Sequence, residues 1–304
     1  MQQSSPTGHS WLMVAALGLI WGSTFMVIEV ALKGITPFWL AAGRITFAAL
    51  LTTAIWQVKG RRLFAPGPAF PWATLGIVGA LSSAVPFMAI SWGQQFVTSG
   101  FAGVSMAAVA LMVLPLAHFM VPGDALTKRK SLGFLIGFIG VVILIGPGAF
   151  SSTGTAGEGA GRLALLGAAS CYALSSVLMR RLPPVDPIGL SAVTLIIGAV
   201  IVIVVALMVE GTPPLPDNRT LILIAILGLI PTAGANLLRV LVIRTAGPTF
   251  MSLTNYQVPI WSVLMGTIFL GEPLNPNLFL ALAMILSGVA LSQWGALRRL
   301  FRRP

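Results

Sequence analysis

The chain has 304 residues, of which 57% are hydrophobic and only 8% are charged. A soluble domain carries roughly a quarter charged residues, so this chain lacks the surface that water requires. Apolar segments of about 20 residues, long enough to cross a bilayer, recur along its whole length. The composition therefore predicts an integral membrane protein.

The formal net charge of +11 does not indicate a nucleic-acid-binding protein. The basic residues form short clusters between apolar runs, and no stripe of interleaved arginine and aromatic residues marks a nucleic-acid groove. The single cysteine, Cys171, excludes a disulfide within the chain and a multi-cysteine zinc site. The start MQQSSPTGHSW has no positive segment before a long apolar stretch, so the first apolar run is expected to remain as a helix.

Proline, glycine and charged residues divide the sequence into ten predicted membrane-spanning helices. Short connections join them, which leaves no room for a soluble catalytic domain. The expected ranges are 11–33, 37–58, 71–94, 98–121, 131–147, 161–181, 187–210, 219–243, 248–271 and 277–297.

The lysines and arginines are distributed asymmetrically over the connections and so predict an orientation. If the N-terminus is cytoplasmic, the outward connections hold only Lys33, Arg162 and Arg219, together with most of the acidic residues. We therefore expect both termini in the cytoplasm. The inward segments then hold Lys59, Arg61, Arg62, Lys128, Arg129, Lys130, Arg180, Arg181, Arg244 and the four arginines of the C-terminus.

The second half of the sequence repeats the first at a shift of 148 residues. Segment 98–127 aligns without a gap on segment 246–275, and this places Asp124 at Glu272. Chance similarity between two apolar segments is the alternative, but the register held over two helices favours a true repeat.

Each repeat contains five predicted helices, and an odd number turns the second copy upside down in the membrane. Inverted repeats are a common plan of secondary transporters, with the substrate near the bilayer midplane. The predicted fold is an all-α integral membrane protein with ten transmembrane helices in two inverted five-helix repeats, 1–148 and 149–304.

Three stretches, LIWGSTF (19–25), FWLAAGRITFAALL (38–51) and NYQVPIWSVLMGTIFLGEPLN (255–275), resemble the EamA-type exporters of the drug/metabolite transporter superfamily. The chain is closest in appearance to the bacterial aromatic amino acid exporters of that family. The resemblance implies export of amino acids, metabolites or drugs across the bacterial inner membrane, without ATP hydrolysis. In the family a proline is expected at a position that corresponds to about Leu111. This sequence instead has Pro115, about one turn nearer the cytoplasm.

Polar and aromatic residues recur at the predicted mid-depth of the first, third, fourth, sixth, eighth and ninth helices. Side chains of this kind at bilayer depth usually face a cavity or another helix. They predict a central cavity for a small, partly apolar solute, although serine and threonine also bond backbone carbonyls or join helices. The candidate residues are Trp21, Thr24, Phe25, Ser82, Ser83, Pro86, Met106, Tyr172, Ser175, Asn236, Thr254, Gln257 and Trp261.

Two charged residues within the spans have alternative interpretations. Glu29 either pairs with Lys33 one turn later or carries a coupling proton. Arg44 either snorkels to the interface, pairs with Glu29 or attracts a substrate carboxylate. The glycines Gly133 and Gly137 belong to a small-residue stripe, which tight helix packing explains without a ligand.

The favoured function is secondary transport by alternating access, most consistent with amino acids that include aromatic ones. The sequence has no G-x-x-x-x-G-K-[ST] motif, which argues against a nucleotide-driven pump. A drug or lipophilic-cation exporter of the same fold is the alternative; a membrane-embedded enzyme is disfavoured, because no cluster of nucleophiles or metal ligands is present. We expect a monomer in membrane lipid with a small-molecule substrate, and no cofactor, metal, nucleic acid or ATP.

Overall fold

The computed structural model describes residues 7–61, 63–64, 71–121, 126–145 and 157–301. This part of the chain is helical, apart from connections and one isolated backbone bridge between Phe64 and Val185. It contains ten long helical segments, as the sequence predicts. They are α1 (Gly8–Ala31), α2 (Pro37–Val58), α3–η1–α4 (Trp72–Gly93), α5 (Ser99–Met120), α6 (Lys128–Ile145), α7 (Glu158–Met179), α8 (Pro187–Val209), α9–η3–α10 (Asn218–Ala246), α12 (Thr254–Leu270) and α13 (Pro276–Ser292).

Seven of these segments, among the described residues, are long and apolar enough to cross a membrane, and α13 is a shorter apolar helix. Most helix ends lie within three residues of the expected ranges. Two predicted helices are divided. The range 248–271 splits into α11 (Pro248–Met251) and α12, because the intervening turn uses tighter bonds such as Leu253 N–H to Phe250 O. The range 277–297 splits into α13 and α14 (Trp294–Phe301).

Two long segments change to π-helical geometry at related positions. The segment η1 (Ala80–Ala84) joins α3 (Trp72–Gly79) to α4 (Val85–Gly93), and η3 (Gly228–Gly234) joins α9 (Asn218–Leu227) to α10 (Ala235–Ala246). The two π segments begin 148 residues apart, which is the shift of the sequence repeat. Each lies beside or contains a proline, which removes one backbone donor from the helical ladder.

Four of the seven acidic residues serve the N-termini of helices, where backbone N–H groups have no partner within the helix. Asp186 and Asp217 cap their own helices, α8 and α9. Glu210 reaches back to α2, where its carboxylate accepts from the backbone of Phe38 and Trp39 at 3.0 and 3.1 Å. The carboxylate of Glu272 likewise accepts from backbone N–H groups at the start of α5. These carboxylates therefore fix helix ends.

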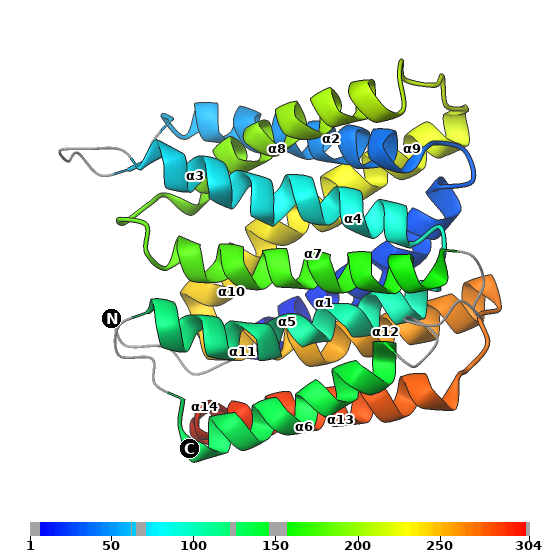
Figure 1. Ribbon diagram of the computed structural model, residues 1–304. Helices are drawn as coiled ribbons and strands as arrows, with labels where there is room; N and C mark the ends of the chain where they lie inside the picture. Colours follow the sequence, from blue (N-terminus) through cyan, green and yellow to red (C-terminus); the bar gives the residue numbers. More distant parts are fainter. Residues whose placement is uncertain (1–6, 62, 65–70, 122–125, 146–156, 302–304) are drawn as a thin grey trace.

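The helices lie side by side along a common direction (Figure 1). The pair α6 and α13 forms one edge, α2 and α8 pack together toward the other, and α1, α5, α7 and α12 lie between them. We call the end that carries connections 32–36, 94–98, 210–217 and 271–275 the Glu272 end; it is on the right in Figure 1.

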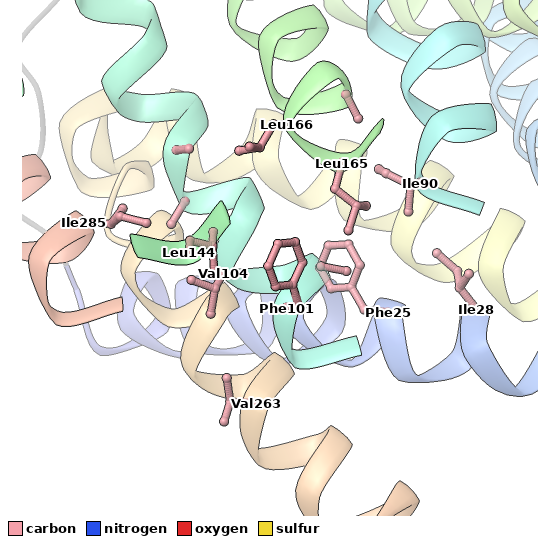
Figure 2. Close-up of a cluster of buried hydrophobic side chains, with 14 of the residues drawn as sticks. Phe25, Ile28, Ile90, Phe101, Val104, Leu144, Leu165, Leu166, Val263 and Ile285 are labelled. Carbon is pink, nitrogen blue, oxygen red and sulfur yellow. The ribbon is translucent and has the colours of Figure 1, made fainter. Parts of the chain in front are cut away.

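The largest buried cluster lies among these central helices. Figure 2 shows Phe25 of α1 and Phe101 of α5 in this cluster, together with Ile90, Leu165 and Val263. Lipid tails are as apolar as these side chains, so close van der Waals packing rather than escape from water holds the helices together.

The edge pair α6 and α13 makes backbone-to-backbone contact at glycines. A Cβ atom added at Gly288 would lie 2.6 Å from the backbone nitrogen of Gly137, and one added at Gly133 would lie 2.5 Å from the carbonyl oxygen of Gly288. The small-residue stripe predicted from the sequence is therefore a packing surface.

We predict that Gly288→Ala lowers the stability of the purified protein by about 1–3 kcal/mol, because rigid backbone atoms must move to admit the methyl group. Thermal unfolding followed by tryptophan fluorescence in detergent would measure the change. Gly167→Ala is the matched control, since an added Cβ there meets nothing within 4 Å. Equal effects of the two substitutions would contradict the packing argument.

Candidate functional site

The side chain of Arg44 brings several segments together in the interior. Arg44 is buried on α2, and its Nε donates to Oγ1 of Thr232 in η3 at 2.9 Å. Its guanidinium carbon lies 4.2 Å from the centre of the Phe87 ring on α4, a cation–π geometry. Tyr172 of α7 is close enough to interact with it electrostatically.

No acidic residue in the described part of the chain forms an ion pair with Arg44. The ion pair found at Arg162 involves Glu158, its neighbour on α7. Glu29 lies beside Glu272, so the structure does not bring it to Arg44. Of the guanidinium nitrogens of Arg44, only Nε has a hydrogen-bond partner among the described residues. The two Nη atoms have none in that part of the chain, and they are not completely buried. Buried charges are normally paired, so a buried arginine with no acidic partner among the described residues is an exception.

The π-helical geometry of η3 places the partner of Arg44. Pro231 has no N–H to give to the carbonyl of Leu227 one turn earlier, and the hydroxyl of Thr232 donates to that carbonyl at 2.8 Å. The same hydroxyl oxygen accepts from Arg44. The indole of Trp21 donates to the carbonyl of Pro231 at 2.9 Å, and this bond ties α1 to η3.

The predicted residues Gln257 and Trp261 of α12 lie against α1. They face Gly18 and Gly22, where any added side chain would meet them. Gln257 is half-buried, and its amide makes no hydrogen bond to another described residue. The structure therefore brings Gln257 and Trp261 to the α1–α12 contact, whereas Trp21 of α1 is bonded to η3.

Several predicted hydroxyls bond backbone carbonyls of their own helices. Thr24 donates to Ile20 O, Ser175 donates to Tyr172 O, and Ser83 lies 2.7 Å from Gly79 O. These bonds fit the alternative in which such groups satisfy the backbone. The remaining candidates are distributed over other surroundings: Phe25 and Pro86 are buried, Ser82 and Met106 are half-buried, Asn236 donates to Thr232 O, and Thr254 is buried with an unpartnered hydroxyl.

Three interior residues outside the predicted set gain importance from the structure. Thr232 holds Arg44, Phe87 lies under its guanidinium, and the buried Gln94 donates to the carbonyl of Phe25 at 2.9 Å. Pro231 beside Thr232 was the available sequence signal, because a proline within a membrane helix requires a substitute donor. Phe87 and Gln94 carry no comparable local signal.

The fold and this polar interior define a helical, multi-pass membrane protein with a buried charge in its interior. The EamA-like transporter family matches residues 7–146 and again residues 159–294. The chain therefore belongs to the EamA-like transporter family and is a membrane transporter.

Similar proteins match this chain over most of its length and over most of their own. The uncharacterized inner membrane transporter YedA of Escherichia coli K12 is 28% identical over 92% of this chain and 89% of its own length. The S-adenosylmethionine/S-adenosylhomocysteine transporter of Chlamydia trachomatis serovar D is 22% identical over 90% of this chain and 85% of its own. A crystal structure with 20% identity and a TM-score of 0.65, covering 95% of this chain and 99% of that one, supports the fold alone.

We predict that Thr232→Val destabilises the protein by about 1–3 kcal/mol, because it removes the hydrogen-bond partner of a buried arginine and of the Leu227 carbonyl. Thr194→Val is the matched control, since the buried Thr194 hydroxyl bonds carbonyls of its own helix. Thermal unfolding in detergent should show a clearly larger loss for Thr232→Val. A loss no larger than that of the control would mean that the bond to Arg44 contributes little.

Proposed function

We propose that this protein exports small metabolites that combine a carboxylate with a hydrophobic group, namely amino acids that include aromatic ones. The observation that carries the proposal is the buried Arg44, which has no acidic partner in the described part of the chain. An arginine fork matches a carboxylate in shape and charge, and two parallel N–H···O bonds fix its orientation.

The surroundings of Arg44 favour the rest of such a molecule. Phe87 and Tyr172 lie next to the guanidinium, and Trp21 is linked through Pro231 to the residue that holds it. Aromatic walls with a few polar anchors are typical of sites for partly apolar ligands. The available amide of Gln257 is a candidate partner for a polar group of the solute.

A lipophilic-cation exporter of the same fold is less compatible with this interior. A cationic substrate would meet the charge of Arg44 without a nearby carboxylate to offset it. The molecules named for the chlamydial relative, S-adenosylmethionine and S-adenosylhomocysteine, both carry an amino acid group. They form the second substrate class to test, because the same arginine suits their carboxylate.

The transport mechanism that we propose is alternating access between two inverted repeats. Its support is the recurrence of structure at the 148-residue shift, where η1 begins at Ala80 and η3 at Gly228. Helix pairs recur too, since α1 packs on α12 as α7 packs on α5, and η3 packs on α2 as η1 packs on α8. Rocking of one repeat against the other would expose the interior to each side in turn.

The orientation that we propose follows from the basic residues of the connections. It places both termini in the cytoplasm, and the Glu272 end then faces outward across the bacterial inner membrane. Export would draw its substrate from the cytoplasmic end, and the self-contained pair of repeats would work as a monomer.

We predict saturable uptake of radiolabelled phenylalanine into proteoliposomes, with no imposed pH or voltage gradient. Arg44→Gln should reduce uptake at subsaturating phenylalanine at least about tenfold, the loss expected for a charge-assisted hydrogen bond. Phenethylamine lacks only the carboxylate and serves as the matched competitor; it should leave wild-type uptake unchanged. Absence of phenylalanine uptake by folded wild-type protein, or full competition by phenethylamine, would contradict the proposal.

We also predict that Gln257→Ala and Trp21→Ala abolish uptake without preventing folding or membrane insertion, because Gln257 has a free amide at the α1–α12 contact and Trp21 bonds η3, the segment that holds Arg44. The same uptake assay would measure the loss, and size-exclusion chromatography would report folding. Ser176→Ala is a suitable control, since its hydroxyl donates to Ala173 O on its own helix. Unchanged uptake in the first two variants would remove them from the site.

A further inference from the structure

A second polar cluster lies at the Glu272 end, where α1, α5 and α12 meet. Glu272 follows α12 and accepts hydrogen bonds from the backbone N–H groups of Ser99 at 2.7 Å and Gly100 at 3.0 Å. These are N-terminal donors of α5, which its own helix leaves without partners. The carboxylate of Glu272 therefore holds the end of α12 to the start of α5.

Close backbone packing joins α5 and α12 at this end. Ser262 of α12 donates to the carbonyl oxygen of Ser99 at 2.7 Å, and Gly103 of α5 faces the same serine. At Gly266 an added Cβ would meet both the Glu272 carboxylate and the Ser99 hydroxyl. Opening the Glu272 end between α5 and α12 requires these contacts to part, the two backbone bonds to Glu272 included.

Glu29 of α1 lies beside this contact. Its carboxyl interacts with the carboxyl of Glu272 and with the backbone of Ser99. The Oε2 atom of Glu29 is buried without a partner among the described residues, and so is the hydroxyl of the fully buried Ser99. Two carboxylates in contact cannot both remain ionised without strong repulsion, so the arrangement calls for a shared proton.

No base in the described part of the structure replaces that proton. The elements packed on α1 carry His118 on α5, Arg219 on α9, Arg239 and Arg244 on α10, and Glu272 after α12, and of these only Glu272 acts on Glu29. Lys33, just after the end of α1, also acts on Glu29, but its side chain is exposed to solvent, which screens its charge.

We propose that Glu29 and Glu272 bind one proton between them while the Glu272 end is closed, and that loss of this proton to water opens that end. The Glu29 carboxyl carries the proton and donates to the Glu272 carboxylate, which stays ionised to cap α5. When the proton leaves, the two negative charges repel, and separation of α1 and α12 from the start of α5 relieves the repulsion. The proton site is independent of the substrate proposed above.

Infrared titration of the purified full chain in detergent, with no substrate, tests the proton site. We expect a protonated-carboxyl signal that remains at about pH 6, where an exposed glutamate is ionised. Glu29→Gln should remove it, and Glu158→Gln, at a carboxylate paired with Arg162, should leave it unchanged. Monodisperse elution would show that each variant is folded. A signal that survives in folded Glu29→Gln, or its absence from the wild type, would overturn the proposal.

Thiol labelling tests the opening. Val263 of α12 is buried next to Gly100, so Val263→Cys in a Cys171→Ser background reports access to the closed contact. Between about pH 6 and pH 8 the labelling rate should rise roughly tenfold more with Glu29 present than in the Glu29→Gln background, since the ionised fraction of one carboxyl that titrates midway between these values rises by about that factor. The introduced thiol ionises in both backgrounds, so its own ionisation does not contribute to the difference between them. Coincident pH profiles would overturn the proposal, whereas failed phenylalanine uptake would leave it untouched.

Discussion

Within a bilayer every backbone polar group needs a partner inside the protein, and one such bond determines the interior of this molecule. Pro231 has no N–H to give to the carbonyl of Leu227, and the hydroxyl of Thr232 donates to that carbonyl. This fixes the direction of the Thr232 oxygen, which then accepts from the buried Arg44. The π-helical segment is therefore both a repair of the backbone and the support for the internal charge. The bond of Trp21 to the Pro231 carbonyl extends the same support to α1.

The contacts between helices differ in how readily they can part. At α6 and α13, glycines such as Gly288 bring two backbones together along an apolar stripe, and any separation loses dispersion contact without new partners in lipid. At α5 and α12 the close approach at Gly266 carries polar groups as well, and those can exchange partners with water. The first contact suits a fixed scaffold. The second suits an end that opens, because hydration offsets the broken hydrogen bonds.

The sequence predicts the helices well because hydropathy and proline or glycine boundaries are local properties. The repeat shift of 148 residues also matches the spacing of the two π segments. Partners distant in sequence could not be predicted in this way. Arg44 and Thr232 are 188 residues apart, and Ser99 and Glu272 are 173 apart, so their hydrogen bonds depend on which helices pack together. Periodicity identifies the buried face of a helix but not the helix that packs against it. The break in the predicted ninth helix before Thr254 depends on backbone hydrogen bonds in the preceding turn, which periodicity does not predict either.

The interior holds two opposite charges and keeps them apart. Within the described residues, Arg44 lies between α2, α4 and η3 with no acid paired to it, while Glu29 and Glu272 lie at one end of α1 and α12 with no buried base beside them. Direct pairing would neutralise both and leave neither site able to bind. In our two proposals, each separated charge takes a transient partner, a carboxylate for Arg44 and a proton for Glu29. The two proposals can therefore be tested separately, because the carboxylate that Arg44 would bind and the proton that Glu29 would share act at different places in the structure.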